Sequence, residues 1–329
     1  MIDPTNIILK DAIDQSATDI HFHPELNEVK IHFRITGQRV FYKTILLAKY
    51  KLILSYCKYN GKLDIGESRL PQQGVMNYKQ DSSHYSLRIS TLPIHSTESL
   101  AIRILPQENI QSLKELFLFP NQFSHVNSWL NNKSGIILFT GPTGSGKTTT
   151  LYAMLKNYIK DYNYQTITLE DPIEKKLEHA LQVQINPGSG LSYDAGLKAA
   201  LRHDPDIIMV GEIRDRSTAE FVFRAAYTGH LVLTTLHAKD TLGTILRLLE
   251  MGIKKLELEQ NLIAIASIEL LPLQMQKYTK QRAAILELLE GKNLFNAINH
   301  KEVSFQTDNF RKLRRKAFAY GYINEDSCY

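Results

Sequence analysis

The segment 141–148, which reads GPTGSGKT, constrains the possible fold of this chain more than any other feature. It matches the pattern GxxxxGK followed by Ser or Thr at every fixed position, and a chance match in a chain of this length is on the order of one in a hundred. An apolar run at 135–140 precedes the segment, and a helical pattern at 151–157 follows it. A strand, a glycine-rich loop and a helix in this order are typical of a P-loop, which binds the phosphates of a nucleotide.

The residue types of this loop suit phosphate binding. Glycines allow backbone conformations, and a close approach of the backbone, that a Cβ atom would block. Successive N–H groups and the positive end of the following helix then point at the phosphates of ATP. We expect Lys147 to reach the β- and γ-phosphates and the hydroxyl of Thr148 to bind Mg²⁺. The predicted nucleotide-binding residues of the loop are Gly141, Pro142, Thr143, Gly144, Ser145, Gly146, Lys147, Thr148 and Thr149.

The region after the loop repeats a rhythm of strand, loop and helix. Short apolar runs at 165–169, 207–210 and 230–235 are each bounded by helical patterns or turn residues. Runs of this kind are typical of the buried parallel strands of a doubly wound sheet. The sequence therefore predicts an α/β fold with a RecA-like P-loop domain and a mainly parallel sheet.

Two domains fit the length of the chain, which is 329 residues. Residues 1–105 alternate short helical and strand patterns, which predicts an N-terminal α+β domain. We place a linker at 106–118 and the P-loop domain at 119–329, with a helical C-terminal part at about 241–329. The helices expected in that part are 241–251, 256–271, 281–290 and 308–320.

Polar residues follow three of the predicted strands, directly after each strand ends. Glu170 and Asp171 follow the first of the three runs, Glu212 follows the second and His237 follows the third. The carboxyl ends of parallel strands meet at one edge of a doubly wound sheet, and ligands bind there. We therefore expect these side chains to surround the P-loop.

Charge suggests a role for each of these residues. Hydrolysis of ATP needs a carboxylate that orients or deprotonates water, and Glu212, at the end of the most apolar run, is the predicted base. Glu170 and Asp171 are predicted to hold Mg²⁺ through water or to position the nucleophile, and His237 to sense the γ-phosphate. Two plainer interpretations stay open, a strand-ending turn for Glu170 and Asp171 and a core histidine for His237.

Composition limits the other classes of function. The net charge of +5 is small against 39 basic and 34 acidic residues, so direct nucleic-acid binding is not expected. The two cysteines, Cys57 and Cys328, are too few for a cysteine zinc site and favour a reducing compartment. The chain has no run of 18 apolar residues, and its N-terminus does not resemble a signal peptide. We expect a cytoplasmic protein that meets the membrane through partners.

Four ordered segments resemble one known family. They are GPTGSGKTTT at 141–150, TLEDPIE at 168–174, LRHDPDIIMVGEIRD at 201–215 and TGHLVLTTLHAKD at 228–240. Further similar segments are SATDIHFHP at 16–24, RLPQQG at 69–74 and LRISTLP at 87–93. On these motifs the chain resembles the GspE/PilB-like secretion ATPases of type II secretion and type IV pilus assembly. It is most similar to their short competence-type members, the ComGA-like proteins.

The resemblance implies a homohexamer in which a neighbouring domain completes each active site. Arg88 and Arg103 would be the family's arginine fingers, and Arg202 and Arg214 further arginines of the nucleotide site. The implied partners are a membrane platform protein of the inner membrane and the pilin assembly machinery. Plainer alternatives stay open, because Arg88 and Arg103 could be surface strand residues and Arg214 could pair with Glu212 in its own chain.

The sequence departs from the family pattern in two informative places. The tetracysteine module of many relatives is absent, so no zinc is expected. SIELL at 267–271 stands where the family commonly has a QRL stretch. The predicted function is an ATPase motor that assembles a competence pilus for DNA uptake. The alternatives are a secretion or pilus-retraction ATPase of the same fold, a DNA-translocating motor, and a nucleotide-binding scaffold without catalysis.

Overall fold

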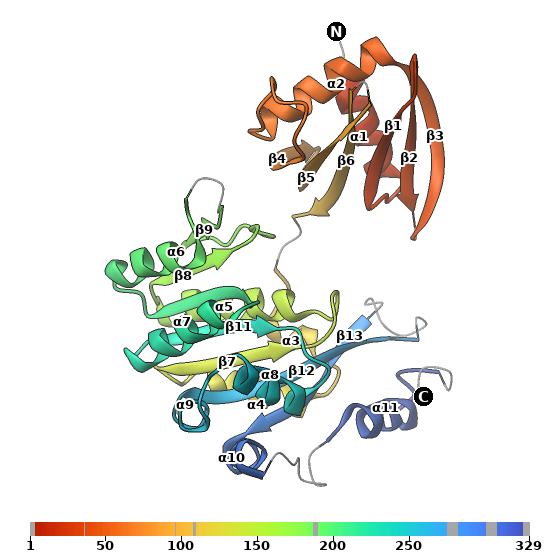
Figure 1. Ribbon diagram of the computed structural model, residues 1–329. Coiled ribbons are helices and arrows are strands. Elements are labelled where there is room, and N and C mark those ends of the chain that lie inside the picture. Colours follow the sequence, from red (N-terminus) through yellow and green to blue (C-terminus); the bar gives the residue numbers. More distant parts are fainter. Residues whose placement is uncertain are drawn as a thin grey trace. The chain divides into compact units, whose positions relative to one another are not determined.

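The computed structural model describes residues 4–35, 37–95, 97–107, 110–186, 190–274, 282–300 and 308–324. The chain divides into two compact units, residues 1–109 and residues 110–329 (Figure 1). The boundary between the units falls inside the segment 106–118, where the sequence predicts a linker.

The first unit is a six-stranded antiparallel sheet with two helices packed on it. The strand order is β3-β2-β1-β6-β5-β4. Apolar side chains alternate along the strands, as Val29, Ile31 and Phe33 do in β2, and they pack against buried residues of both helices. This confirms the predicted α+β character. The elements are α1 Pro4–Asp14, β1 Asp19–Pro24, β2 Glu28–Ile35, β3 Gln38–Leu46, α2 Leu47–Asn60, β4 Gln72–Gln80, β5 Ser83–Ile94 and β6 Thr97–Pro106.

The second unit is built on a seven-stranded sheet of order β13-β12-β7-β11-β10-β8-β9. Every neighbouring pair is parallel except β12 and β13. This confirms the predicted doubly wound, mainly parallel P-loop fold. The strands are β7 Gly135–Thr140, β8 Thr166–Glu170, β9 Ala180–Gln184, β10 Ile207–Ile213, β11 Leu231–Leu236, β12 Leu262–Pro272 and β13 Arg282–Glu290.

Helices cover both faces of this sheet. They are α3 Leu113–Leu116, α4 Pro120–Trp129, α5 Lys147–Tyr162, α6 Tyr193–Ala200, α7 Arg216–Tyr227, α8 Thr241–Glu250, α9 Lys255–Asn261, α10 Gly291–His300 and α11 Phe310–Ala319, with a 3₁₀ turn at Leu201–His203. Within the ranges described above, no helix has both the length and the apolar character needed to cross a bilayer.

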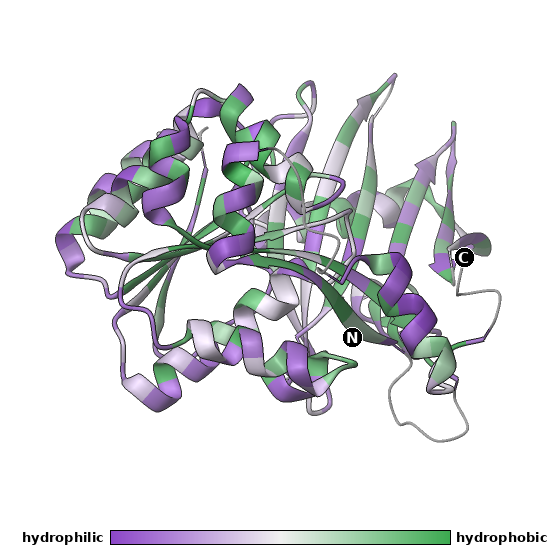
Figure 2. Cartoon of the chain, turned by 90° about the horizontal axis from the view of Figure 1, so that it is seen from below, coloured by the Kyte–Doolittle hydropathy of each residue, from purple (hydrophilic) through white to green (hydrophobic). Residues whose placement is uncertain are grey.

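Both faces of the central strands are buried, which explains their unbroken apolar runs. In β7, Ile136 and Leu138 pack into the core beneath α6 to α10. Ile137 and Phe139 point the other way and pack against α3, α4 and α5. Figure 2 shows the apolar sheet lying between helices whose surfaces mix apolar and hydrophilic residues. This two-sided burial fixes the strand ends that carry the polar motifs.

The C-terminal part is not wholly helical: the helix expected at 281–290 is wrong, and the one expected at 256–271 is helical only at 256–261, within α9. Residues 262–272 and 282–290 form β12 and β13, which extend the sheet beyond β7. Their Leu, Ala and Glu residues favour helix by intrinsic propensity, and a short apolar run cannot be assigned by periodicity alone. Burial between β7 and β13 decides the conformation of β12, because its backbone is hydrogen-bonded on both sides. The expected helices at 241–251 and 308–320 are confirmed as α8 and α11.

Candidate active site

The P-loop connects the carboxyl end of β7 to the first turn of α5, as the motif predicts. Gly141 has φ 137°, and a Cβ atom there would lie 2.8 Å from the carbonyl oxygen of Ile268 in β12. Gly146, with φ 101°, is the residue directly before α5 and adopts the left-handed conformation that suits glycine. The two glycines therefore let the loop fold tightly against β12 and turn into the helix.

Lys147 is folded back over the loop that precedes it. Its Nζ donates to the carbonyl oxygens of Gly141 at 2.9 Å and Pro142 at 2.8 Å. Burial lowers the pKa of Lys147 from its ordinary value, although the Glu212 and Glu174 carboxylates oppose the shift. A cation held in this way can exchange its two carbonyl contacts for phosphate oxygens.

Two hydroxyl side chains of the loop also fit a bound nucleotide. Ser145 Oγ is buried and has no hydrogen-bond partner among the residues that the structure describes. Thr148 is half-buried on the first turn of α5, beside the N–H groups that a helix N-terminus leaves unpaired. Thr149 is half-buried, and Pro142, Thr143 and Gly144 are exposed on the outer side of the loop.

Glu212 is positioned by an irregularity near the end of β10. The pairing of β10 with β11 shifts register between Val210 and Ile213. Ile208, Val210 and Ile213 all pack into the same side of the core. With regular alternation, the next side chain on that side after Val210 would have been that of residue 212. A bulge of this kind re-aims a side chain, and here it turns Glu212 away from that core.

The Glu212 carboxylate lies in a partly exposed polar cluster. Arg214 Nε donates to Glu212 Oε1 at 2.7 Å, and Arg214 Nη1 lies 3.1 Å from Asp171 Oδ2. His237 Nε2 lies 3.3 Å from Glu212 Oε2. The structure thus brings together Asp171, Glu212 and His237, which the sequence assigned to three strand ends, and adds Arg214, which the resemblance assigned to the nucleotide site. The ion pair of Arg214 with Glu212, left open from the sequence, is present.

Glu170 lies in a different environment from the one expected of a metal ligand. It is 3% exposed, and both carboxylate oxygens accept hydrogen bonds from protein side chains. The donors are Tyr152, Thr168 and Gln182. These contacts turn the carboxylate toward α5 and β9, and they do not support the predicted roles of Glu170 in Mg²⁺ binding and catalysis.

The remaining predicted arginines are spread over both units. Arg88 and Arg103 are register partners on β5 and β6, in the first unit. Arg103 Nε donates to Asp19 Oδ1 at 2.8 Å, while Arg88 is half-buried. Arg202 is exposed on the 3₁₀ turn between α6 and β10.

Sequence reasoning missed four residues around the site. Tyr152 and Gln182 contact Glu170, and Glu174 is close enough to act on the pKa of Lys147. Burial raises the pKa of Tyr193 to about 12, and the nearby Asp171 carboxylate adds to the shift. Nothing in the sequence indicated Tyr152 or Gln182 as site residues. Tyr152 lies among apolar residues of α5, and Gln182 lies in β9, a strand that was not predicted. Glu174 lies within the TLEDPIE segment, which could have suggested it.

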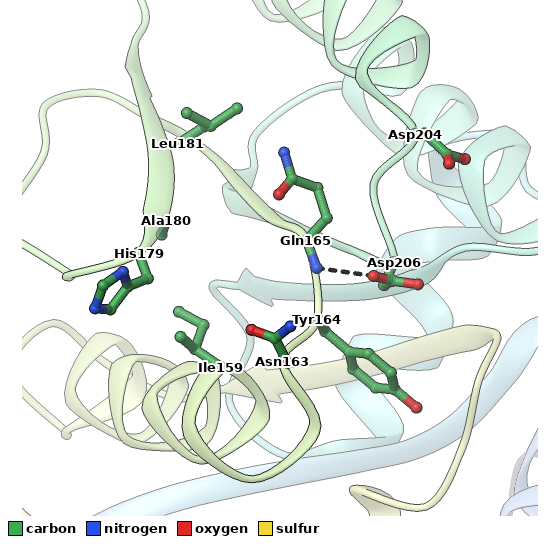
Figure 3. A pocket seen from close by; sticks show the side chains of 9 residues that line it. All are labelled: Ile159, Asn163, Tyr164, Gln165, His179, Ala180, Leu181, Asp204 and Asp206. Carbon is green, nitrogen blue, oxygen red and sulfur yellow. Dashed lines mark hydrogen bonds between the residues drawn. The ribbon is translucent and has the colours of Figure 1, made fainter.

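A cavity of about 550 Å³ opens at the opposite edge of the sheet, where β8, β9 and β10 begin (Figure 3). Three residues beside it, Asn163, His179 and Asp204, have φ values of 54°, 61° and 49°, a region that Asn, Asp and His enter more readily than other non-glycine residues. None of the predicted nucleotide-binding residues lines the cavity. Its lining is Ile159, Asn163, Tyr164, Gln165, His179, Ala180, Leu181, Asp204 and Asp206.

Comparison with known proteins identifies the family. The family described as "Type II/IV secretion system protein" matches residues 1–315. The chain belongs to this family. It is a P-loop ATPase, as the motif predicted, and the predicted membership of the secretion ATPases is confirmed.

Two relatives and one solved structure illustrate the likeness. The competence protein ComGA of Bacillus subtilis (strain 168) is 43% identical over 338 residues, which cover 97% of this chain and 94% of ComGA. The type IV pilus assembly ATPase PilB of Thermus thermophilus is 40% identical over 261 residues, 79% of this chain and 29% of PilB. The crystal structure of the pilus retraction motor PilT with bound ADP is 30% identical, with a TM-score of 0.77 over 100% of this chain and 96% of PilT.

Proposed function

We propose that this secretion-family ATPase uses Glu212 as the general base of ATP hydrolysis. The observation that carries the proposal is the bulge in β10, which takes the Glu212 carboxylate out of the core and places it in a polar cluster close enough to Lys147 to act on its pKa. A carboxylate near the γ-phosphate can accept a proton from the attacking water. Arg214 and His237 hold that carboxylate by its two oxygens.

The loop residues hold the nucleotide in this proposal. The N–H groups of the loop and Lys147 bind the phosphates, and Ser145 Oγ gives a further donor. The Thr148 hydroxyl would help to hold Mg²⁺, which would neutralise negative charge on the phosphates. His237 reports the γ-phosphate to Glu212 through their contact at 3.3 Å. Asp171, Arg202 and Arg214 are assigned to the surroundings of the nucleotide.

Replacement of Glu212 by Gln tests the base directly. General-base catalysis contributes about 10²–10⁴-fold, so we expect Glu212→Gln to lower kcat by at least about 100-fold while ADP still binds. Glu220→Gln is the matched control, because Glu220 is a half-exposed carboxylate that pairs with Arg216 at 2.6 Å on α7. Hydrolysis by Glu212→Gln at the rate of the control would rule out the base assignment.

At the level of the whole machine, we propose a cytoplasmic homohexameric motor that assembles a type IV-like competence pilus for DNA uptake. The support is the 43% identity to a competence protein over nearly the full length of both chains. In a hexamer, Arg88 and Arg103 of one subunit would reach the nucleotide of a neighbour, where a guanidinium stabilises the transferring phosphoryl group. A membrane platform protein and pilins are the proposed partners, and they would hold the motor at the membrane.

The dependence of ATPase activity on protein concentration tests the shared site. Specific activity should rise with concentration, and further on adding the cytoplasmic part of the platform protein. Arg88→Ala should lower activity while hexamers still form. Activity that is independent of concentration, or a fully active Arg88→Ala variant, would argue against completion in trans. Stimulation by DNA but not by the platform protein would favour a DNA motor. If the protein supported secretion or pilus retraction in place of pilus assembly, it would be a secretion or retraction ATPase of the same fold.

A further inference from the structure

A buried group of polar side chains lies between α5, β8 and β9, beside the proposed active site. Its centre is Glu170, whose Oε2 accepts a hydrogen bond from the Tyr152 hydroxyl. Glu170 Oε1 accepts from Thr168 Oγ1 at 2.6 Å and from Gln182 Nε2 at 3.2 Å. We call Tyr152, Thr168, Glu170 and Gln182 the hub.

Regular strand geometry explains why the hub faces α5. Ile167 and Leu169 pack on the opposite side of the sheet, so Thr168 and Glu170 share the face toward α5. Gln182 of β9 is the direct register partner of Thr168. Burial raises the pKa values of Glu170 and Tyr152, while hydrogen bonds from neutral donors act to lower that of Glu170. A carboxylate in this position serves structure better than it serves a water or a metal ion.

The hub also holds the loop that follows β8. The Lys175 N–H donates to the Tyr152 hydroxyl oxygen at 3.3 Å. Gln182 Nε2 donates to the Lys175 carbonyl oxygen at 2.9 Å, and Gln182 Oε1 accepts from the Leu177 N–H at 2.7 Å. Two hub side chains thus hold residues 175 and 177 by their backbone.

This loop carries two acidic residues toward the catalytic cluster. Asp171 contacts Arg214, which in turn contacts Glu212, and the Glu174 carboxylate opposes the lowering of the Lys147 pKa by burial. A chain of contacts therefore runs from the P-loop helix through Tyr152 to the loop 171–177, and from that loop to Glu212. Tyr152 is part of α5, which begins at Lys147, so a displacement of the P-loop helix reaches the loop through one hydroxyl group.

We propose that Tyr152, Glu170 and Gln182 are positioning residues that fix the loop 171–177 against the P-loop helix and so orient Arg214 and Glu212 for hydrolysis. The proposal rests on Glu212 as the base. It gives Glu170 a role through other residues, in place of contact with Mg²⁺ or water. Nucleotide affinity, which the P-loop supplies, should depend little on the hub, whereas the rate of hydrolysis should depend on it strongly.

The test compares two buried tyrosines of the same helix in the full-length protein. Tyr152→Phe removes the hub hydroxyl. Tyr158→Phe is the matched control, because Tyr158 is equally buried and its hydroxyl donates to the Trp129 carbonyl oxygen at 3.2 Å, which lies outside the loop 171–177. We expect Tyr152→Phe to lower kcat about tenfold with less than a twofold change in KM for ATP, because small errors of position cost rate more than binding. Tyr158→Phe should keep the wild-type kcat, even if its melting temperature falls by as much as that of Tyr152→Phe.

A second variant keeps the outcome decisive. Gln182→Leu removes three hydrogen bonds at nearly constant volume and should lower kcat by a similar factor. The double variant should be less impaired than the product of the two factors, because both changes release the same loop. Wild-type kcat in Tyr152→Phe and Gln182→Leu would overturn the proposal, as would a loss that appears only in KM. Glu212→Gln, assayed alongside, separates the cases: if it is inactive while the hub variants are normal, only the hub proposal fails, and if it is active, the base assignment fails.

Discussion

The ends of β8 and β10 are neighbours in one sheet, and each delivers a glutamate in a different way. Glu170 of β8 is buried, and neutral hydroxyl and amide donors surround its carboxylate. Glu212 of β10 is partly exposed and contacts Arg214 and His237. β8 keeps regular alternation to its last residue, whereas β10 contains a register shift between Val210 and Ile213. The contrast teaches that a position at a strand end does not by itself fix a role, because local strand geometry decides which way the side chain points.

Loss of the Lys147 ammonium group should have the largest effect on ATPase activity, because neither glutamate can support hydrolysis when ATP is not held at the P-loop. Lys147→Ala removes the buried ammonium group that we propose binds the phosphates, so we expect ATPase activity to fall by at least about 100-fold and ATP binding to weaken. Lys160→Ala, an exposed change on the same helix, is the control. Retention of full activity by Lys147→Ala would mean that the site does not lie at this loop.

Arg214 connects the two strand ends, because it contacts Glu212 after β10 and Asp171 after β8. Arg214→Gln should lower kcat about tenfold, since the Glu212 carboxylate loses a charged donor and its orientation. Arg216→Gln removes a neighbouring exposed arginine that pairs only with Glu220 on its own helix, according to the described contacts. Equal activity of the two variants would show that the connection does not matter for hydrolysis.

The hydrogen bonds of the buried Glu170 at the end of β8 should contribute to the free energy of unfolding. Thr168→Val removes the hydroxyl that donates to Glu170 at 2.6 Å, and a buried acceptor that loses a donor costs about 1–3 kcal/mol. Thr234→Val on β11 is the control, because Thr234 is equally buried and, among the described residues, its hydroxyl donates only to the Thr235 carbonyl oxygen, at 3.5 Å. In urea unfolding, the midpoint concentration of Thr168→Val should be lower than that of Thr234→Val. Equal midpoints would mean that the hub adds little to the fold.

Asp19 extends the comparison to a third carboxylate, and its effect should be the smallest. Burial alone would raise the pKa of Asp19, but hydrogen bonds from Arg103 and Thr18 bring it below its ordinary value. A folded-state pKa below that of the unfolded chain gives stability that is present above the unfolded value and lost as pH falls through the folded value. Asp19→Asn should therefore be less stable than wild type at pH 7. The difference should be about 1 kcal/mol or less, because its partner Arg103 is exposed to solvent. The two melting temperatures should converge in strong acid, and a gap that widens there would contradict this assignment.

The sequence predicted the part of the molecule that depends on local pattern. The P-loop, the strands β7, β8, β10 and β11, and the gathering of Asp171, Glu212 and His237 could be inferred, because apolar runs and glycine spacing specify them directly. Arg214 was implied by the family resemblance. β12 and β13 could not, because their helix-favouring residues become strands only through pairing with β7 and with each other.

The orientation of the two glutamates also lay beyond the sequence. The direction of Glu212 depends on one extra residue in the pairing of β10 with β11, which leaves no compositional signal. The surroundings of Glu170 depend on Gln182 in β9, and Tyr152 is an ordinary member of an apolar helix until α5 packs on the sheet. Long-range packing decides both cases.

The most direct measurement is the kcat of Glu170→Gln beside that of Glu212→Gln, in the full-length protein at saturating ATP and Mg²⁺. An amide at position 170 keeps an oxygen for Thr168 and Gln182 and can donate to the Tyr152 oxygen, so we expect Glu170→Gln to stay within about threefold of wild type. An amide at position 212 cannot take a proton from water, so Glu212→Gln should fall by at least about 100-fold. If Glu170→Gln were as inactive as Glu212→Gln, or Glu212→Gln as active as wild type, the division between a positioning and a catalytic glutamate would be wrong.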